Sequence, residues 1–118
     1  MEMIELYKRT FASCIRFAVY RKKEVISDVE KFMSILHTFV LSFLTKNLYG
    51  LGQEDYEILK CVLLQILQDM VQALENRDTV LLEDTVEYGL KEFLELFFVD
   101  EHELNKLRED ALHEYGNL

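Results

Sequence analysis

The stretch FMSILHTFVLSFL, residues 32–44, contains thirteen residues and no charged side chain. The uncharged run extends to Thr45 and is closed by Lys31 and Lys46. A membrane-spanning helix needs about 20 consecutive apolar residues, so this run is too short to cross a bilayer. We therefore expect it to be the most buried helix of a helical domain, and we expect no membrane partner.

The few polar residues of this run are ordered along it. They recur at helical spacing and form one narrow stripe, which comprises Lys31, Ser34, Thr38, Ser42 and Thr45. Because residues three and four apart share a face of an α-helix, the rest of the circumference is apolar. A helix of this kind is buried in a core or carries a face that contacts another chain.

Composition and charge restrict the fold and the partners. The chain has 118 residues, of which 50% are hydrophobic, four are glycine and none is proline. One domain of this size can bury a core without disulfides, and an all-β domain would need more turn residues. The net charge of −9 disfavours contact with phosphate backbones, so we expect no nucleic acid partner. The segment MEMIELYKR lacks the hydrophobic block of a signal peptide, and we expect a cytoplasmic protein.

Hydrophobic periodicity predicts four main helices and a shorter fifth one. We expect them at about residues 2–21, 27–47, 53–75, 78–97 and 100–115. The predicted fold class is therefore all-α. It is an antiparallel four-helix bundle over residues 1–99, followed by a short acidic C-terminal helix at 100–118 that packs on the same domain or frays from it.

Helix ends and packing give further expectations. Ser27 with Glu30 resembles a capping box for the second helix, Asp100 with Glu103 resembles one for the fifth, and Asp78 or Thr79 can cap the fourth. Gly89 lies beside the apolar face of the fourth helix, where glycine costs about 1 kcal/mol, so we expect a close helix–helix contact there. Residues 1–23 carry a net charge of +4 and residues 78–118 a net charge of −9. The first helix is thus expected near the fourth and fifth, although solubility alone could account for the same charges.

No motif in the sequence indicates catalysis, and we expect no enzyme, catalytic residue, metal or cofactor. Cys14 and Cys61 lie far apart without metal-like spacing, and apolar residues follow each of them. We expect both to be reduced core thiols. His37 lies at the edge of an apolar helix face, and we interpret it as a residue at the rim of the core.

Carboxylates at helical spacing leave one enzymatic alternative open. The pairs are Glu24/Asp28, Glu54/Glu57, Glu83/Glu87 and Glu92/Glu95. All-α nucleotide pyrophosphatases bind magnesium with such pairs on facing helices, since magnesium prefers oxygen ligands. The pairs here fall on polar helix faces, and we interpret them as solvated. The alternative is a metal-dependent nucleotide phosphohydrolase that uses Glu54, Glu57, Glu83 and Glu87.

The most informative feature is a surplus of hydrophobic residues outside the main stripes. Off-stripe residues include Leu6, Phe17 and Tyr20 on the first helix, Ile58, Val62 and Leu64 on the third, and Leu81 and Tyr88 on the fourth. A second stripe either widens the core or forms a groove or dimer face that accepts another helix. We predict a partner-binding surface made by Leu6, Phe17, Leu81 and Tyr88.

Two segments resemble the flagellar export chaperone family, small cytoplasmic helical bundles that hold the C-terminal segment of flagellin. TFASCIRFA at residues 10–18 is similar to the apolar first helix of that family. Residues 63–97 are similar to its last helix pair, which is joined by an Asn-x-Asp turn. The resemblance implies a non-enzymatic, chaperone-like adaptor that holds an amphipathic helix of a partner, including a role in flagellar export. A homodimeric structural module, in which the partner is a second copy of the chain, is a further interpretation.

Overall fold

The computed structural model describes residues 2–20, 25–98 and 100–115, and within them the side chains of residues 3–15, 26–98 and 100–115. The helices are α1 (Glu2–Tyr20), α2 (Val25–Thr45), α3 (Gln53–Glu75), α4 (Thr79–Asp84), the π-helix η1 (Thr85–Lys91), α5 (Glu92–Glu95) and α6 (Glu101–Tyr115). These described ranges contain no β-strand, so the predicted all-α class is confirmed.

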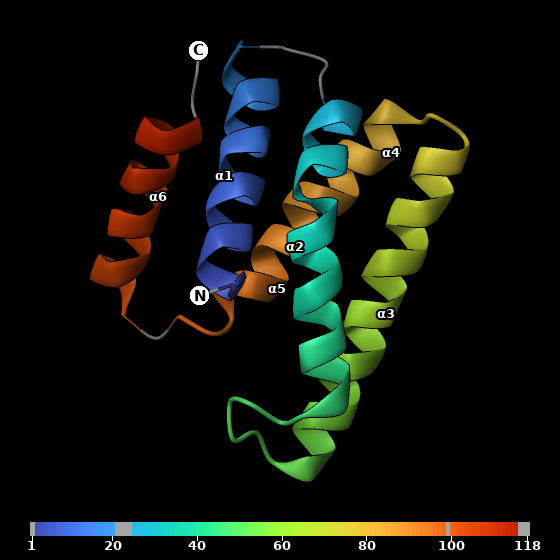
Figure 1. Ribbon diagram of the computed structural model, residues 1–118, viewed down its shortest axis with the longest axis vertical. Helices are drawn as coiled ribbons and strands as arrows, with labels where there is room; N and C mark the ends of the chain where they lie inside the picture. Colours follow the sequence, from blue (N-terminus) through green and yellow to red (C-terminus); the bar gives the residue numbers. More distant parts are fainter. Residues whose placement is uncertain (1, 21–24, 99, 116–118) are drawn as a thin grey trace.

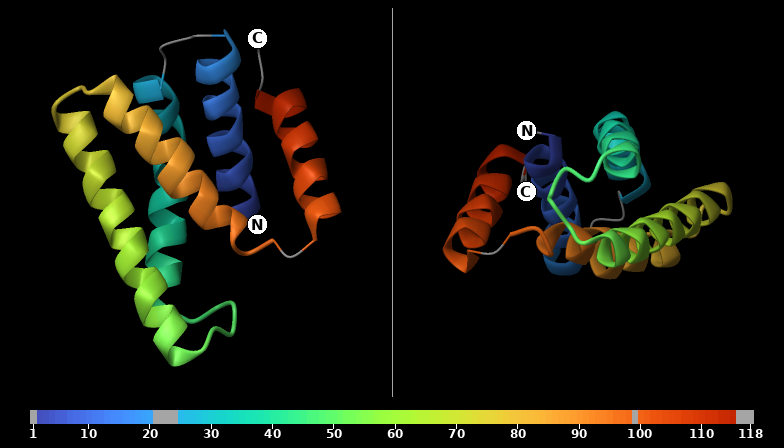
Figure 2. Two further views of the ribbon diagram at one scale, coloured as in Figure 1. Left: turned by 180° about the vertical axis from the view of Figure 1, so that it is seen from behind. Right: turned by 90° about the horizontal axis from the view of Figure 1, so that it is seen from below.

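The helices form two layers with one helix at the side. α4, η1 and α5 follow one another without a break and act as one long helix behind α1 and α2 (Figures 1 and 2). α3 lies beside that long helix and contacts α4, η1 and α2. α6 lies on the outer side of α1, the helix that it contacts most (Figure 1). The expectation that the first helix lies near the fourth and fifth is therefore confirmed.

The uncharged run of α2 forms the centre of the core. The buried residues of α2 include Val29, Phe32, Leu36, Phe39, Val40 and Phe43. The predicted polar stripe lies on the opposite side, where Lys31, Ser34, Thr38 and Thr45 are exposed and Ser42 is half-buried. His37 is also exposed, so its assignment to the rim of the core was wrong. No helix in the described ranges is long and apolar enough to span a bilayer.

Phe43 joins α2 to the other layer through an aromatic cluster. Its ring centroid lies 5.7 Å from that of Tyr56 on α3, 5.5 Å from that of Phe93 on α5 and 5.8 Å from that of Phe97. The Tyr56 hydroxyl donates a hydrogen bond of 2.6 Å to the backbone carbonyl of Phe43. Tilted and edge-to-face aromatic pairs of this kind add to the free energy gained by burying the rings.

Asp78 and Asp100 act as the predicted cap residues, although for the capping box at residue 100 only the Asp100 half is observed among the described contacts. The backbone N–H of Leu81 donates to the Asp78 carboxylate at 3.0 Å, and that of His102 donates to the Asp100 carboxylate at 2.9 Å. The capping box at Ser27 was wrong, because α2 already begins at Val25. The half-buried Ile26 side chain packs against the core, which extends the helix beyond the predicted start.

Gly89 makes the close contact that the sequence predicted. A Cβ atom at this position would lie 3.3 Å from Cγ1 of Ile66 on α3. Gly89 also lies within η1, a π-helical segment that periodicity did not predict. π-Helical turns are rare and occur mostly as single insertions in α-helices. The absence of a side chain here lets η1 and α3 approach.

Leu36 and Leu41 on α2 test which face of the uncharged run is buried. Leu36 is 1% exposed and Leu41 is 51% exposed. Leu36→Ala should lower the free energy of unfolding by about 2–5 kcal/mol, because it leaves a cavity in the core. Leu41→Ala removes the same atoms from the surface and should change it by about 0.5 kcal/mol or less. Urea denaturation measures both, and equal losses would contradict the assignment of the buried face.

Candidate partner-binding surface

The four residues predicted to bind a partner do not form one surface. Leu6 is fully buried and Leu81 is half-buried, whereas Tyr88 is 64% exposed. Phe17 lies outside the residues whose side chains the structure describes. Leu6 was assigned wrongly because α1 has α2, η1 and α6 as neighbours, so that more than one stripe of its circumference is covered.

Exposed hydrophobic side chains are instead most frequent on α3. Among the described residues, α3 contributes Ile58, Val62, Leu64 and Val71 to the exposed large hydrophobics. The neighbours of α3 are α4, η1 and α2, which leave its outer side open. The sequence held a signal for this surface, since Ile58, Val62 and Leu64 already lay outside the main stripe of the helix. Periodicity alone gave no reason to prefer these three residues over the off-stripe residues of other helices as a partner-binding surface.

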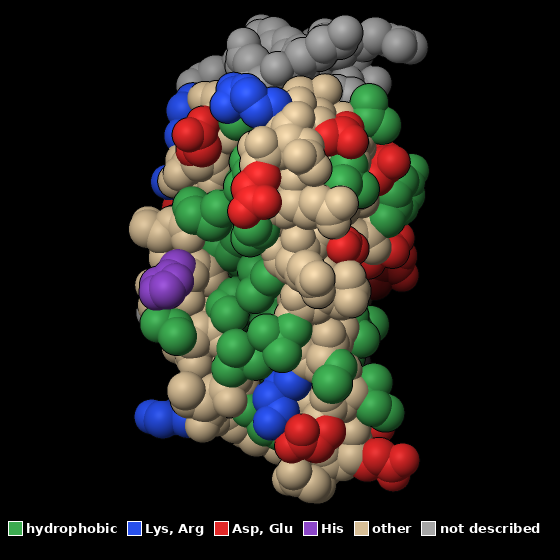
Figure 3. Space-filling view, turned by 90° about the vertical axis from the view of Figure 1, so that its right-hand side faces the viewer, with side chains coloured by type: hydrophobic (Ala, Val, Ile, Leu, Met, Phe, Trp, Pro, Cys, Tyr) green, Lys and Arg blue, Asp and Glu red, His purple; other side chains and the backbone are tan. Residues whose placement is uncertain are grey.

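Leu64, Leu67 and Val71 form a row on α3 that we call the α3 stripe. Their spacing of i, i+3 and i+7 places them on one helix face. They line a shallow depression together with Gln68, Gln72 and Glu75. Figure 3 views the side of the molecule on which α3 lies and shows hydrophobic side chains along the seam between α2 and α3. The arrangement is an apolar strip with polar residues at its edge.

Glu83 is the most unusual polar residue of the interior. It is 3% exposed, and neither carboxyl oxygen has a hydrogen-bond partner within the described structure. Burial, together with the nearby carboxylates of Glu87, Asp84 and Asp28, raises its pKa to about 7. A buried carboxyl group surrounded by other acids favours its neutral form. The interpretation of Glu83 as a solvated residue was therefore wrong.

The two cysteines differ in environment. Cys14 is buried, and burial together with the charges of Glu83 and Glu87 raises the pKa of its thiol. The thiolate is the reactive form of cysteine, so this environment makes Cys14 inert. Cys61 is exposed on α3, which contradicts its assignment to the core.

The structure does not bring the four carboxylates of the phosphohydrolase alternative together on a shared exposed site. Glu54 and Glu57 are exposed on α3, Glu83 is buried on α4, and Glu87 is half-buried on η1. No group of three or more His, Cys, Asp or Glu side chains in the described ranges is placed to hold a metal ion.

Comparison with known proteins gives one match. The profile of a family described as "Domain of unknown function (DUF8042)" matches residues 17–98. No curated protein and no solved structure matches the chain. The matched part contains α2, α3 and the long helix α4–α5 in full, and it ends before α6.

Glu83 predicts how stability depends on pH. The pKa of Glu83 is about 7 in the folded state, against a reference value of 4.5. Between these two pH values the folded chain keeps a proton on Glu83 that the unfolded chain has released. The contribution of neutral Glu83 to the free energy of unfolding is fully present at low pH. It is lost as the pH rises through 7, because the carboxylate then ionises while it is buried. Glu83→Gln should therefore raise the free energy of unfolding at pH 8 by about 1–3 kcal/mol and leave it nearly unchanged at pH 5.

Thermal and urea denaturation between pH 5 and pH 8 measure this effect. Glu92→Gln is the matched control, since Glu92 is an exposed acid of the same long helix and is not among the charges that raise the pKa of Glu83. It should shift stability by about 0.5 kcal/mol or less at either pH. A Glu83→Gln profile that runs parallel to that of the unmodified chain would contradict the assignment.

Proposed function

The chain belongs to the DUF8042 family, whose function is unknown, and from its geometry we propose that it is a non-enzymatic protein-binding domain. It holds an amphipathic helix of a partner protein against the α3 stripe. In this proposal α1, α2, α3 and the long helix α4–α5 form an antiparallel bundle that serves as a rigid platform. The family match includes all of α3.

The observation that carries the proposal is the exposure of Leu64 and Val71 beside the half-buried Leu67. A row of this spacing extends over about 10 Å of helix, which is two turns. A partner helix with apolar anchors at i, i+3, i+4 and i+7 fits such a surface, because the two rows can interlock. Burying a Leu or Val side chain contributes about 1.5–3 kcal/mol, so a few anchors suffice for measurable affinity.

The resemblance to flagellar export chaperones indicates which partner to test first. That resemblance covers most of residues 10–97, and the α3 stripe falls within it. A chaperone of this kind holds the C-terminal segment of flagellin as a helix. We therefore take a flagellin C-terminal peptide as the first probe and a designed Leu-based amphipathic helix as the second. A cytoplasmic location is part of the proposal and rests on the same resemblance.

Charge substitutions on the α3 stripe test the proposal. The double variant Leu64→Glu with Val71→Glu places two charges where the partner helix would bury apolar side chains. We expect it to weaken peptide binding at least about tenfold, since each lost anchor costs about 1.5 kcal/mol or more. Both positions are exposed, so its melting temperature should stay within a few degrees of the parent chain. Fluorescence anisotropy of labelled peptide and thermal denaturation measure these quantities.

Val80→Glu is the matched control, because Val80 is an exposed residue of α4 outside the stripe. It should bind both peptides as the parent chain does. Binding that is lost equally in the control would place the site elsewhere. If neither peptide binds and light scattering finds a monomer, the proposal is wrong. Concentration-dependent dimers that the double variant abolishes would identify a second copy of the chain as the occupant.

A further inference from the structure

α6 is attached to the rest of the chain mainly through α1. It lies at the side of the molecule, and α1 is the helix that it contacts most (Figure 2). Ala111 is its one buried side chain among the described residues 101–115. Leu104 and Leu107 are half-buried and pack against the core. A helix held by so little apolar burial is expected to open at a lower free energy than the central helices.

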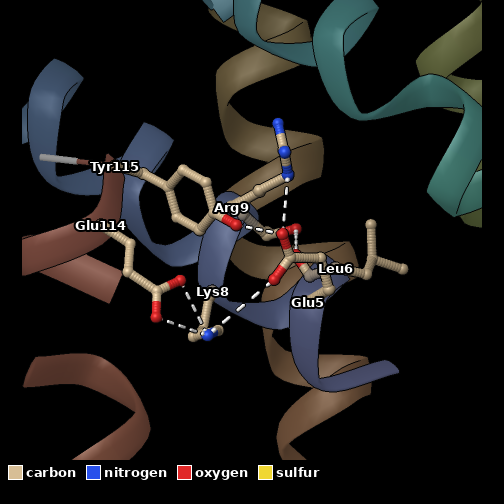
Figure 4. A network of polar contacts seen from close by, with 7 residues as sticks. Glu5, Leu6, Lys8, Arg9, Glu114 and Tyr115 are labelled. Carbon is tan, nitrogen blue, oxygen red and sulfur yellow. Dashed lines mark hydrogen bonds and ion pairs between the residues drawn. The ribbon is translucent and has the colours of Figure 1, made fainter. Parts of the chain in front are cut away.

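Polar contacts hold the C-terminal half of α6 on α1. The Lys8 ammonium donates to both carboxylate oxygens of Glu114, at 3.0 Å and 2.9 Å. The Tyr115 hydroxyl donates to the Glu5 carboxylate, which also pairs with Arg9 at 3.4 Å (Figure 4). These groups are only partly buried, so water and salt compete for them.

A second group of contacts holds the middle of α6. Arg108 donates to Glu95 on α5 at 2.8 Å and to the Tyr7 hydroxyl on α1 at 3.1 Å. The Tyr7 hydroxyl in turn donates to Glu95 at 2.6 Å. Burial and the hydrogen bond to Glu95 raise the pKa of Tyr7, which keeps this hydroxyl protonated. α6 therefore covers a site on α1 and α5 that would keep ordered polar groups after α6 had left.

Charge and family coverage distinguish this site from the rest of the domain. α6 carries five acidic residues and two Lys or Arg, and the described α1 side chains that it contacts include the cations Lys8 and Arg9. The family match begins at residue 17 and ends at residue 98. It leaves out α6 and also Glu5, Tyr7 and Lys8, which are among the α1 residues that α6 contacts through side chains. The α1 part of the site and its occupant thus both lie outside the matched range, whereas Glu95 of α5 lies within it.

We propose that the face of α1 around Glu5, Tyr7 and Lys8 is a docking site for an acidic amphipathic helix, and that α6 is its intramolecular occupant. α6 leaves and returns while the other helices stay folded. A partner helix with Leu residues three apart and a Glu at the position of Glu114 binds the same site when α6 is released. This site is separate from the α3 stripe and does not depend on the function proposed for it.

The probe is a labelled peptide of residues 100–115, added to the full-length chain. In the parent chain the tethered α6 competes at an effective concentration in the millimolar range, so the peptide should bind weakly. The variant Leu104→Glu with Leu107→Glu weakens the tethered α6 and leaves the site intact. We expect it to bind the peptide at least about tenfold more tightly than the parent chain does, with affinity that falls as salt rises.

A charge exchange supplies the matched control. Adding Lys8→Glu to that variant should reduce peptide binding at least about tenfold, and a peptide with Glu114→Lys should restore it. A variant that stays helical by circular dichroism but does not bind the peptide would overturn the proposal. Peptide affinity that is unchanged by Lys8→Glu would overturn the proposal as well.

Hydrogen exchange of the unmodified chain provides an independent measurement if the variant does not fold. The amides of α6 should exchange faster than those of α2, and added salt should accelerate α6 alone. Exchange of α6 only together with α2, through global unfolding, would overturn the proposal.

Discussion

Burial of one face of α2 is the constraint on which the arrangement of the other helices depends. The uncharged run is too apolar to remain exposed to water and too short to span a bilayer. Neighbouring helices must therefore cover it. Phe43 helps to determine which helices pack over this face, because its ring contacts aromatic rings of both α3 and α5. α1, α3 and α4 contact α2, whereas α6 contacts mainly α1.

The two proposed surfaces follow from what this packing leaves uncovered. α3 uses one side for the core, and its outer side keeps exposed Leu and Val residues. α6 shows the opposite case, since it buries little and is held by charged side chains. Apolar contacts between helices give affinity that is insensitive to salt, whereas exposed ion pairs weaken as salt rises. In the two proposals, the domain therefore binds one helix through apolar contacts at α3 and another through charged side chains at α1.

Glu83 is an exception within a mainly apolar interior, which also buries Thr10, Ser13, Asp28 and Thr85. A carboxyl group without partners is costly to bury in its ionised form, and the surrounding acids increase that cost. Protonation reduces the cost, which links the packing of α4 to pH near neutrality. The same surroundings keep the Cys14 thiol protonated. The interior of this domain thus contains a carboxyl group and a thiol group whose pKa values are both raised by burial and nearby acids.

The sequence by itself determined the all-helical class, the turn capped by Asp78 and the close contact at Gly89. Each depends on residues near one another along the chain or on glycine's missing side chain. Only the tertiary structure decided that Leu6 is buried, that Cys61 is exposed and that Glu83 faces the interior. Periodicity shows which residues share a helix face, but it does not show how many neighbouring helices cover that helix. α1 has neighbours on several sides and α3 has an open side, so the candidate surface moved from the predicted residues of the first and fourth helices to α3.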